Sequence, residues 1–508
     1  MASLAPQHTK RTVAHEMVRI PESKLMDGPA QAEMPQLPWH RTKIICTLGP
    51  ATDQPGVLAR LIGAGMMDVA RFNLSHGDHA SHARRIQQVR QLAQQAGRFI
   101  AVLMDLPGPK FRLGELSNGA RELHLGADVI LALEADPPDG LPVKHPALLQ
   151  ALRVGESVYL ADGAIRLEVK IAGAERVVCQ VLVSGTVTSG SGINVPESKR
   201  SVLIPTDDDR RHLVFALEQQ AEWIGVSFVQ SADDLIRVRT LLPPGQQPLL
   251  MAKIEKRQAL VDLDAIMATS DGVMVARGDL GVETDLAEIP LVQKRIIALA
   301  NAQARPVITA TQMLESMVTQ EQPTRAEVTD VANAMLDGTD GVMLSAETAI
   351  GRFPVAAAEI LQRVLTATET EYAVRVARDR LRASESTPAT NPISLVACQL
   401  AARLNAKAII APVRDIATAL GIARFRPAAP LVVMADSEDL CRRLAVVWGV
   451  SPLLAVAEFE PQSCLYLASH WLCAQGLAQP GDPVVMLSTS GAAQGAADTL
   501  QVMRVDNS

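Results

Sequence analysis

The sequence lacks the features that mark membrane-spanning, secreted and nucleic-acid-binding proteins. It has no apolar run of the roughly 20 residues that cross a bilayer, and its N-terminus lacks the apolar core of a secretory signal. Its formal net charge is −7 without a strongly basic segment, whereas binding along a nucleic-acid backbone requires a stripe of Lys and Arg. We therefore expect a cytoplasmic protein without membrane or nucleic-acid partners.

Paired cysteine motifs are also missing. Scattered cysteines without C-x-x-C spacing are typical of reduced thiols rather than of a disulfide framework or a structural zinc site. We expect most of them to be core residues. The six cysteines are Cys46, Cys179, Cys398, Cys441, Cys464 and Cys473.

What the chain does have is length and apolar content. Its 508 residues exceed what one hydrophobic core supports, and a hydrophobic fraction of 48% is enough to fill about three domains. Residues 1–40 mix Pro, His, Gln and charged residues without periodicity. We interpret them as an N-terminal extension that packs loosely or lies on a neighbouring subunit.

Short apolar segments alternate with helical segments from about residue 41 onward. The apolar segments are too continuous for a sheet with one wet face, which indicates parallel strands buried on both sides. Eight such units close a (β/α)8 TIM barrel of class α/β, which we assign to residues 41–113 and 201–368. The expected strands are residues 43–49, 67–75, 99–105, 223–228, 249–255, 272–279, 306–311 and 341–347.

Two further domains are expected. Residues 114–200 separate the third strand from the fourth and contain Gly-rich turns and alternating segments. A structureless loop of that length is implausible in a compact domain, so we assign a small β-barrel lid domain inserted over the barrel mouth. After a polar linker, apolar segments alternate with helices again and predict a C-terminal α/β domain at residues 385–508.

The most informative segment is Met251-Ala-Lys-Ile-Glu255. Side chains two residues apart on a strand share a face, so Lys253 and Glu255 project together. The next strand ends in Arg277-Gly-Asp279, where we expect a loop. Glu255 and Asp279 can bind Mg²⁺ with waters and a phosphorylated substrate as the remaining ligands, while Lys253 neutralises the phosphate. A structural ion pair at a strand end is the alternative.

Polar residues recur at the carboxyl ends of strands two to eight, the face on which enzymes with this barrel carry their active sites. A random scatter of polar side chains would not favour the same end of successive strands. The residues are Arg71, Asn73, Ser75, His76, Asp105, Ser227, Lys253, Glu255, Arg277, Asp279, Thr309, Thr311, Ser345 and Glu347.

Seven ordered motifs in the barrel region resemble those of the pyruvate kinase family. The resemblance covers residues 41–365 strongly and extends more faintly into the C-terminal domain through residues 423–427 and 447–452. The motifs are Lys43-Ile-Ile-Cys-Thr-Leu-Gly-Pro50, Ala70-Arg-Phe-Asn-Leu-Ser-His-Gly77, Ala252-Lys-Ile-Glu255, Val273-Met-Val-Ala-Arg-Gly-Asp-Leu-Gly281, Ala310-Thr-Gln-Met-Leu-Glu-Ser-Met317, Pro323-Thr-Arg-Ala-Glu327 and Met343-Leu-Ser-Ala-Glu-Thr-Ala349.

The resemblance implies transfer of a phosphoryl group from phosphoenolpyruvate to ADP, followed by protonation of the enolate to pyruvate. Positioning and charge neutralisation dominate the catalysis of such a transfer. By resemblance, Lys253 and Arg71 would contact the phosphoryl group, and Lys253 would also stabilise the enolate oxygen. Glu255 and Asp279 would hold Mg²⁺ or, alternatively, Mn²⁺, and Thr311 would take part in protonating the enolate.

The resemblance also implies ligand-binding residues and an assembly state. Like most members of the family, the protein would be a homotetramer. The residues that would bind substrate are Arg71, Lys253, Ala276, Arg277, Gly278, Asp279 and Thr311. Those that would bind the nucleotide are Pro50, Asn73, His76, Arg112 and Asp162.

One departure from the family concerns its monovalent cation. Most members bind K⁺ through Asn, Ser, Asp and Thr and carry a Glu shortly afterwards. The Lys110 ammonium stands where that Glu would be and can supply the charge of K⁺, as in the K⁺-independent members. We therefore expect that K⁺ is not required; a solvated surface lysine is the alternative. The residues corresponding to this site are Asn73, Ser75, Asp105, Leu106 and Lys110.

A second departure lies in the C-terminal domain. The sugar-phosphate effector loop of the family is rich in Ser, Thr and Gly, so that amides and hydroxyls can bind a phosphate. The corresponding segment here is Val413-Arg-Asp-Ile-Ala-Thr418, in which Ile416 replaces the Gly and Asp415 would repel an anion. We therefore expect that fructose 1,6-bisphosphate does not activate the enzyme.

Two other functions remain open at the level of sequence. The first is a Mg²⁺-dependent barrel aldolase or lyase that handles a pyruvate enolate, although the inserted lid and the motif that begins at Thr311 argue against it. The second is a catalytically silent relative that binds metabolites and regulates a partner, which the altered segment 106–110 favours. An assay with phosphoenolpyruvate, ADP and Mg²⁺ separates the three functions.

Overall fold

The structure is a computed structural model that describes most of the chain. The extension expected at residues 1–40 lies outside the described residues except for His40, and so does Asp162. The described residues are 40–133, 140–144, 146–161, 163–196, 203–245, 247–384, 392–455, 460–488 and 499–506.

Eight parallel strands form a closed barrel in the order β1-β17-β16-β15-β14-β13-β3-β2, which confirms the expected fold class. Each strand lies within one of the eight segments expected from the sequence. The barrel strands are β1 (Lys43–Thr47), β2 (Val69–Asn73), β3 (Ala101–Asp105), β13 (Trp223–Val226), β14 (Leu249–Ile254), β15 (Gly272–Ala276), β16 (Val307–Ala310) and β17 (Gly341–Leu344).

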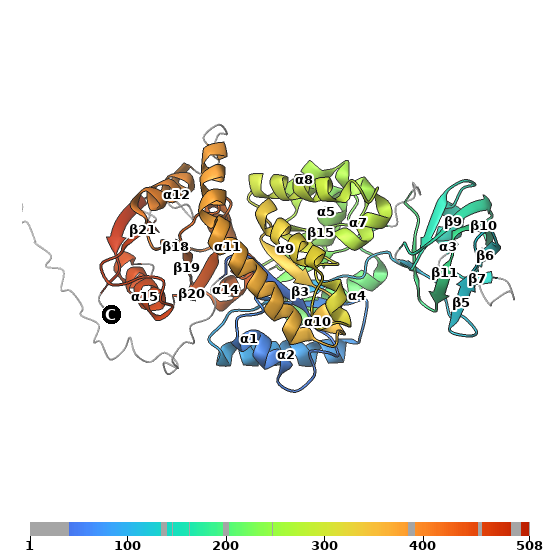
Figure 1. Cartoon of the computed structure of the whole chain (residues 1–508), viewed down its shortest axis with the longest axis horizontal. Helices are drawn as coiled ribbons and strands as arrows, with labels where there is room; N and C mark the ends of the chain where they lie inside the picture. The colour runs from blue at the N-terminus through green and yellow to red at the C-terminus, as the bar shows by residue number, and fades with distance from the viewer. Residues whose placement is uncertain are drawn as a thin grey trace, which may run out of the picture. The chain divides into compact units, whose positions relative to one another are not determined.

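Helices surround the barrel strands (Figure 1). Thr206 caps α4 and Thr324 caps α9, each in a capping box that satisfies backbone donors at the helix start. No helix in the described ranges is both long and apolar enough to span a bilayer. The helices of this region are α1 (Val57–Gly63), α2 (His79–Gln95), α4 (Asp207–Glu218), α5 (Ala232–Thr240), α6 (Leu263–Thr269), α7 (Arg277–Glu283), α8 (Ile289–Ala302), α9 (Arg325–Asp337), α10 (Ala346–Ala349) and α11 (Pro354–Ser384), with 3-10 turns at Arg257–Leu260 and Glu315–Val318.

The expectation of a loop after β15 is wrong, because Arg277-Gly-Asp279 begins helix α7 directly. Two glycines disfavour a helix in this segment by intrinsic propensity. Tertiary contacts compensate for them: the Gly278 amide donates to Thr311 Oγ1 at 2.7 Å, and the Arg277 guanidinium pairs with Asp330 at 2.6 Å.

Apolar side chains fill the barrel from both sides of the sheet. A cluster that includes Trp223, Met251, Met274 and Met343 lies inside it, and a larger cluster lies between the strands and the surrounding helices. Filled layers of this kind make the barrel a packed core rather than a pore. The polar residues are therefore left to the strand ends.

The inserted segment forms its own sheets and core. In β9 buried and more exposed residues alternate, as expected for strands with one wet face. The strands form a seven-stranded sheet, β4-β12-β8-β9-β10-β6-β7, and a two-stranded sheet, β11-β5. The elements are β4 (Phe111–Arg112), β5 (Ala120–Leu123), β6 (Asp128–Ala132), β7 (Gly140–Pro142), α3 (Pro146–Ala151), β8 (Ser157–Leu160), β9 (Ile165–Ile171), β10 (Arg176–Val183), β11 (Gly185–Thr188) and β12 (Gly192–Asn194).

The C-terminal segment is an α/β domain with a five-stranded sheet in the order β20-β19-β18-β21-β22. Its last strand is antiparallel to β21. Both β20 and β22 are partly exposed edge strands, so neither forms the continuous buried apolar run that predicts a strand, and the sequence analysis does not predict them. The elements are α12 (Pro392–Leu404), β18 (Ile409–Val413), α13 (Ile416–Ala423), β19 (Leu431–Ala435), α14 (Glu438–Leu444), β20 (Val450–Leu454), α15 (Pro461–Ala474), β21 (Pro483–Ser488) and β22 (Thr499–Arg504).

The cysteines are free thiols, and all of them except Cys473 are buried. Burial raises the pKa of Cys179 and, together with Asp436 and Glu438, that of Cys441 to about 12. Both thiols are therefore protonated near neutral pH and behave as small apolar groups. The expectation that most of the cysteines are core residues is confirmed.

Candidate active site

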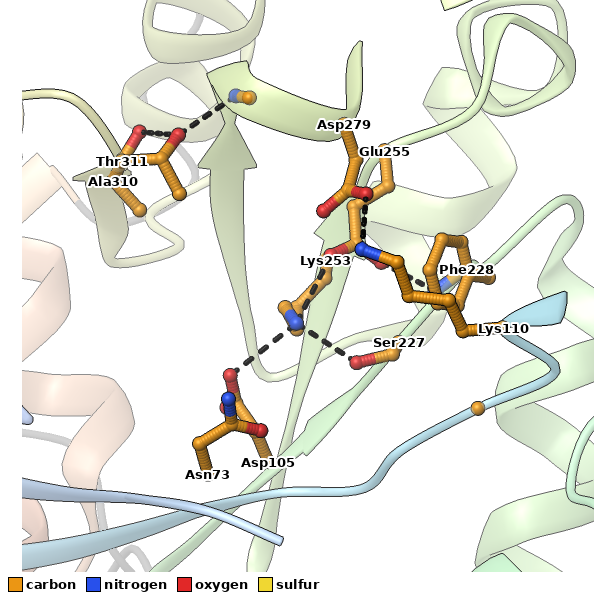
Figure 2. Close-up of polar contacts among 12 residues, drawn as sticks. Asn73, Asp105, Lys110, Ser227, Phe228, Lys253, Glu255, Asp279, Ala310 and Thr311 are labelled. Atoms are coloured by element: carbon orange, nitrogen blue, oxygen red, sulfur yellow. Dashed lines mark hydrogen bonds and ion pairs between the residues drawn. The ribbon is translucent and has the colours of Figure 1, made fainter. Parts of the chain in front are cut away.

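Lys253 lies at the centre of the polar groups at the strand ends. It is next to last in β14, and Glu255 follows directly after the strand, so both side chains project from the same face. The Lys253 ammonium lies 2.9 Å from Glu255 Oε1 and 3.3 Å from Asp105 Oδ2, and it donates to Ser227 Oγ at 2.8 Å (Figure 2). Three neighbouring strand ends thus hold one ammonium group.

These contacts keep Lys253 charged although it is buried. Burial alone would lower its pKa, but Asp105 and Glu255 together outweigh burial and raise the pKa above its ordinary value. The carboxyl group of Asp105 responds in the opposite sense. Burial would raise its pKa, and the cations Lys253 and Arg71 lower it. The site therefore keeps a fixed positive charge away from bulk water.

Glu255 and Asp279 form an anionic pair beside Lys253. Burial raises the pKa of Glu255, and the nearby Asp279 carboxylate adds to this rise, although Lys253 and the Phe228 amide oppose it. The Phe228 amide donates to Glu255 Oε2 at 2.6 Å and fixes the carboxylate. A raised carboxyl pKa shows that negative charge in this position is incompletely compensated, which suits a bound cation.

The donor set at these carboxylates fits Mg²⁺. No cluster of three His, Cys, Asp or Glu ligands occurs among the residues that the structure describes. Mg²⁺ in phosphoryl-transfer sites is usually held by one or two carboxylates, with water and substrate phosphate as the other ligands. Glu255 and Asp279 supply that number, and a softer metal would need His or Cys ligands that these two positions do not provide.

Lys110 reaches the same carboxylates from another direction. Its ammonium lies 3.2 Å from Asp279 Oδ1, and its side chain is 21% exposed (Figure 2). Lys110 precedes β4, so its neighbour Asp279 is 169 residues away along the chain. The location does not agree with a solvated surface lysine, because the head group is directed at the proposed metal ligands.

Arg71 approaches Lys253 through their shared partner Asp105. Its guanidinium donates to Asp105 Oδ2 at 3.0 and 2.8 Å through Nε and Nη2, and to Thr47 Oγ1 at 3.0 Å through Nη1. This fork geometry fixes the guanidinium plane at the end of β2. Arg71 and Lys253 are thus two cations held by one buried carboxylate.

Thr311 has a strained backbone. Its φ is 67° and that of Gln312 is 56°, both in the left-handed region that β-branched residues rarely adopt. The strain turns the Thr311 hydroxyl toward α7, where it accepts from the Gly278 amide at 2.7 Å and donates to the Ala310 carbonyl at 2.6 Å (Figure 2). Strain of this kind recurs at functional sites, where surrounding contacts enforce it.

Arg277 reinforces this arrangement. Its guanidinium donates to the Thr311 carbonyl at 2.8 Å and to Asp330 Oδ1 at 2.8 Å. The Arg277 side chain therefore binds other residues of the protein, and only the backbone from Ala276 to Asp279 is left to bind a ligand. Arg277 was expected to bind substrate, but its side chain holds the backbone at Thr311 in place.

Three of the expected nucleotide-binding residues lie near one another, at the end of β2, just after it and in β4. They are Asn73, His76 and Arg112. Burial lowers the pKa of His76, and the cations Arg112, Lys110 and Arg71 lower it further, so positive charge gathers around this imidazole. Arg112 donates to the Gly190 carbonyl at 3.1 Å. Pro50 follows β1 and is exposed. Asp162 lies outside the described residues.

The residues of the expected monovalent-cation site are only partly assembled. Asn73 Oδ1 accepts from the Ser75 amide at 3.2 Å, and Asp105 Oδ1 is buried without a hydrogen-bond partner. Leu106 is 2% exposed and packs in the apolar cluster between the strands and the surrounding helices, so its side chain takes no part in the site. The Asp105 Oδ1 oxygen is packed against the Gly225 backbone, where a Cβ would clash with it.

Thr309 does not belong to the site, in contrast to the expectation from the sequence. Its hydroxyl donates to Thr339 Oγ1 at 3.0 Å, and Thr339 precedes β17 at the opposite end of the barrel. Ser345 and Glu347 do lie after β17. Glu347 is completely buried and accepts from the Leu314 amide at 3.1 Å. Ile308 and Ala310 belong to the apolar cluster inside the barrel, so the alternation of side chains along β16 directs Thr309 to the other face of the sheet.

The sequence did not assign roles to several residues that hold the site together. Ser227 binds Lys253 and Thr47 binds Arg71, and both are small hydroxyl residues at strand ends. Asp209 accepts from the Gly108 amide at 2.8 Å in the segment that carries Lys110. The capping box beginning at Thr206 marks Asp209 as a helix cap in the sequence, but its contact with Gly108 depends on the fold.

The fold and the site define a (β/α)8-barrel enzyme that handles a negatively charged substrate beside two carboxylates. Comparison with protein families matches residues 39–358 to the pyruvate kinase barrel domain and residues 391–503 to the pyruvate kinase alpha/beta domain. The chain belongs to the pyruvate kinase family. Its enzymes transfer the phosphoryl group of phosphoenolpyruvate to ADP to give pyruvate and ATP, and this is the activity of the chain.

Individual relatives give the same result. The chain is 39% identical to pyruvate kinase 2 of Synechocystis sp. over 92% of its length and 79% of the relative. It is 38% identical to pyruvate kinase of Geobacillus stearothermophilus over 92% of its length and 80% of the relative. With pyruvate kinase of Agrobacterium vitis it shares 39% identity over 92% of its length and 97% of the relative. These similarities decide against an aldolase or lyase and against a silent relative.

Proposed function

We propose that Lys253 and Arg71 stabilise the phosphoryl group in transit between phosphoenolpyruvate and ADP, with Lys253 also stabilising the enolate oxygen. The observation that carries this proposal is the buried Lys253 ammonium between Asp105, Glu255 and Ser227. A charge fixed in this way needs no reorganisation when negative charge develops on the reacting oxygens. Arg71 adds a second fixed cation through Asp105.

Glu255 and Asp279 hold Mg²⁺ in this proposal, with Mn²⁺ as an alternative. When bound, the divalent cation supplies positive charge next to the phosphoryl oxygens. Each carboxylate has an ammonium partner in the structure, Lys253 and Lys110 respectively. A cation on the carboxylates would release part of that attraction, so that both ammonium groups can pair with substrate phosphate.

Thr311 and the backbone from Ala276 to Asp279 bind the substrate carboxylate. The Gly278 amide is paired with the Thr311 hydroxyl in the structure, so the substrate carboxylate would take over one or both of these donors. Thr311 also takes part in protonating the enolate. A hydroxyl is a weak acid, so a water chain would complete the proton path.

The nucleotide binds on the side of His76. Pro50, Asn73 and Arg112 line this side, and Asp162 contributes from the lid. Support comes from the three cations that surround the His76 imidazole, because ADP brings several negative charges. A neutral His76 can still accept or donate a hydrogen bond there.

Lys110 replaces the monovalent cation that most of the family requires. Its ammonium lies beside Asp279, where a positive charge offsets the carboxylates and the incoming phosphates. The enzyme would therefore turn over without K⁺, while Asn73, Ser75 and Asp105 retain acceptors that could still take a cation.

Replacing Lys110 by Glu tests this role. The rate should be compared in tetramethylammonium and in K⁺ at a matched concentration of about 100 mM, so that screening is equal. We expect a wild-type rate that is similar in both salts. In Lys110→Glu we expect the K⁺-free rate to fall by about tenfold or more, because a charge contact near developing anions is lost.

K⁺ should restore part of the Lys110→Glu rate if Asn73, Ser75 and Asp105 still form a cation site. Lys170→Glu is the matched control, because Lys170 pairs with Glu168 on the same lid strand and its reversal changes the net charge equally. A wild-type enzyme that is inactive without K⁺, or a Lys110→Glu enzyme that resembles the control, would contradict the proposal.

The metal assignment is tested by a Mg²⁺ titration of the coupled assay with phosphoenolpyruvate and ADP. We expect Glu255→Ala to need at least about tenfold more Mg²⁺ than the wild type, because one carboxylate holds this hard and strongly hydrated ion poorly. Glu359→Ala is the control, since Glu359 forms an exposed pair with Arg60. An unchanged titration in Glu255→Ala would exclude Glu255 as a ligand.

The assembly state and compartment complete the proposal. We expect a cytoplasmic homotetramer, as the resemblance to the family implies. Light scattering coupled to size exclusion measures the mass directly, and a mass of one chain of 54.3 kDa would contradict a tetramer.

A further inference from the structure

The segment Leu106-Pro107-Gly108-Pro109-Lys110 has very few backbone hydrogen-bond donors. Proline has no N–H, so Gly108 carries the one backbone donor between Leu106 and Lys110. The amides at the two ends of the segment are paired: Leu106 donates to the Gly225 carbonyl at 2.9 Å, and Lys110 donates to the Gly108 carbonyl at 2.9 Å. The Gly108 amide donates to Asp209 Oδ1 at 2.8 Å. Asp209 thus holds the middle of the segment by its single available donor.

The Asp209 carboxylate is itself rigidly held. It is 1% exposed and belongs to the first turn of α4. Its second oxygen, Oδ2, accepts from the Thr206 amide and from Thr206 Oγ1, both at 2.8 Å. A side chain locked by hydrogen bonds of its own positions its partner better than a freely rotating one.

Gly108 also places the segment against the active-site strands. Its φ is +65°, and a Cβ at this position would lie 2.8 Å from Phe228 Cδ2 and 3.0 Å from Ser227 Cβ. Ser227 binds the Lys253 ammonium, and the Phe228 amide binds Glu255. The segment that carries Lys110 therefore rests directly on the residues that hold Lys253 and Glu255.

We propose that Asp209 is the positioning residue for Lys110: by holding the Gly108 amide, it keeps the Lys110 ammonium at Asp279 and thereby makes the reaction independent of K⁺. This inference rests on the proposed role of Lys110. A lysine side chain has many rotamers, so its head group stays at one carboxylate only if the backbone that carries it is fixed. When the anchor is lost, Lys110 leaves Asp279 and an external monovalent cation gains a role.

The test compares the ratio of turnover in K⁺ to turnover in tetramethylammonium, at equal ionic strength, for two variants and a control. Asp209→Ala removes the anchor. Gly108→Ala displaces the same segment without changing Asp209, because the new Cβ would collide with the Phe228 ring. Leu213→Ala removes a buried apolar side chain of α4 but none of the hydrogen bonds of Asp209, so it controls for a weakened α4.

We expect a ratio near one in the wild type and in Leu213→Ala, and a ratio of about ten or more in Asp209→Ala and Gly108→Ala, since a displacement of about 1 Å at a reacting site can cost a hundredfold. A general loss of stability would lower both rates and leave the ratio unchanged. If Asp209→Ala does not fold, the Gly108→Ala ratio decides.

A ratio near one in a folded Asp209→Ala enzyme would overturn the inference, and so would an equal rise in Leu213→Ala. Lys110→Glu, measured in the same way, separates this failure from failure of the proposed function. If Lys110→Glu gains a K⁺ requirement and Asp209→Ala does not, only the positioning role is wrong. If Lys110→Glu is indifferent to K⁺, both proposals are wrong.

Discussion

At the scale of single residues, the site depends on cations that remain charged without water. Lys253 and Arg71 share the Asp105 carboxylate, and that carboxylate is buried together with them. Unpaired charges in such a position would be strongly unfavourable, whereas a compensated group is stable and rigid. The same compensation makes each member of the group sensitive to the loss of its partner.

Lys253→Met should abolish phosphoryl transfer while the protein remains folded. Methionine fills a similar volume but removes the charge that stabilises the transition state, so we expect kcat to fall by about a thousandfold or more. Coupled turnover measures the loss, and circular dichroism and Mg²⁺ binding check the fold and the metal site. Lys294→Met is the control, because Lys294 forms an ion pair with Asp337 and is 56% exposed. Near-normal turnover in Lys253→Met would refute the assignment.

We expect His82 to make the stability of the protein depend on pH. Its ring packs edge-on against Phe72 and its Nε2 lies 2.8 Å from the His76 carbonyl. Burial lowers its pKa below the ordinary value of 6.5, and Arg85 lowers it further, although the His76 carbonyl opposes the shift. As the pH falls below about 6.5, the unfolded chain therefore takes up this proton before the folded protein does. The contribution of His82 to stability is present above that pH and is lost as the pH falls.

We expect the melting temperature to fall between about pH 7.5 and pH 5.5, and to fall less in His82→Gln. Glutamine keeps a donor for the His76 carbonyl but does not titrate. His76 and His212 also have pKa values lowered by burial, so part of the pH slope should remain in the variant. Thermal unfolding at a series of pH values measures both slopes, and identical slopes would show that His82 does not contribute.

At the scale of elements, helix α13 begins in the segment that the sequence resemblance aligns with the family's effector loop. Asp415 is the N-cap of this helix, and its carboxylate accepts from the Thr418 amide at 3.2 Å. An aspartate there satisfies a backbone donor and complements the positive end of the helix. The protein's own carboxylate therefore occupies the position that would attract a phosphate.

Fructose 1,6-bisphosphate should therefore leave the phosphoenolpyruvate saturation curve unchanged. Binding would bring a phosphate against Asp415 and would have to displace its contact with Thr418. The measurement is initial rate against phosphoenolpyruvate concentration with and without the bisphosphate. A shift of the curve to lower concentrations would contradict the prediction. Inorganic sulfate at the same ionic strength controls for a general effect of anions.

At the scale of the whole described structure, the C-terminal domain packs against the amino end of the barrel. Ala445 and Val446, which follow α14, belong to the same apolar cluster as the residues inside the barrel. Trp223 at the start of β13 donates through Nε1 to the Arg443 carbonyl at 3.3 Å. Barrel and C-terminal domain therefore share part of one core.

A buried ion pair joins the two parts. Arg426 is 2% exposed, and its Nη1 lies 2.8 Å from Asp340 Oδ1 just before β17. The same guanidinium donates to the Gly338 carbonyl at 2.6 Å and lies 4.9 Å from the centre of the Trp448 ring. Removal of the cation would leave a buried carboxylate with fewer partners.

Arg426→Met should destabilise the protein by about 3–5 kcal/mol, as expected when one partner of a buried pair is removed. Arg60→Met is the matched control, because Arg60 pairs with Glu359 across an exposed gap of 3.5 Å and such pairs contribute about 0–1 kcal/mol. Thermal unfolding of both variants measures the difference. Equal melting temperatures for the two variants would show that the Arg426 contact adds no more than a surface pair.

The sequence alone determined the eight barrel strands and the shared face of Lys253 and Glu255. Continuous apolar runs indicate buried parallel strands, and a period of two places Lys253 and Glu255 on one face of β14. Both are local properties, because each depends on neighbours within a few residues. The edge strands β20 and β22, which have no continuous buried run, were missed for the same reason.

Only the tertiary structure decided which distant groups meet. Nothing near Lys110 in the sequence indicates that its ammonium reaches Asp279, or that Asp209 holds Gly108 from a helix 101 residues away. Helix α7 forms against its own propensity because Thr311 and Asp330 hold its first residues. These contacts depend on how strands and helices pack in space, and local sequence patterns do not encode that packing residue by residue.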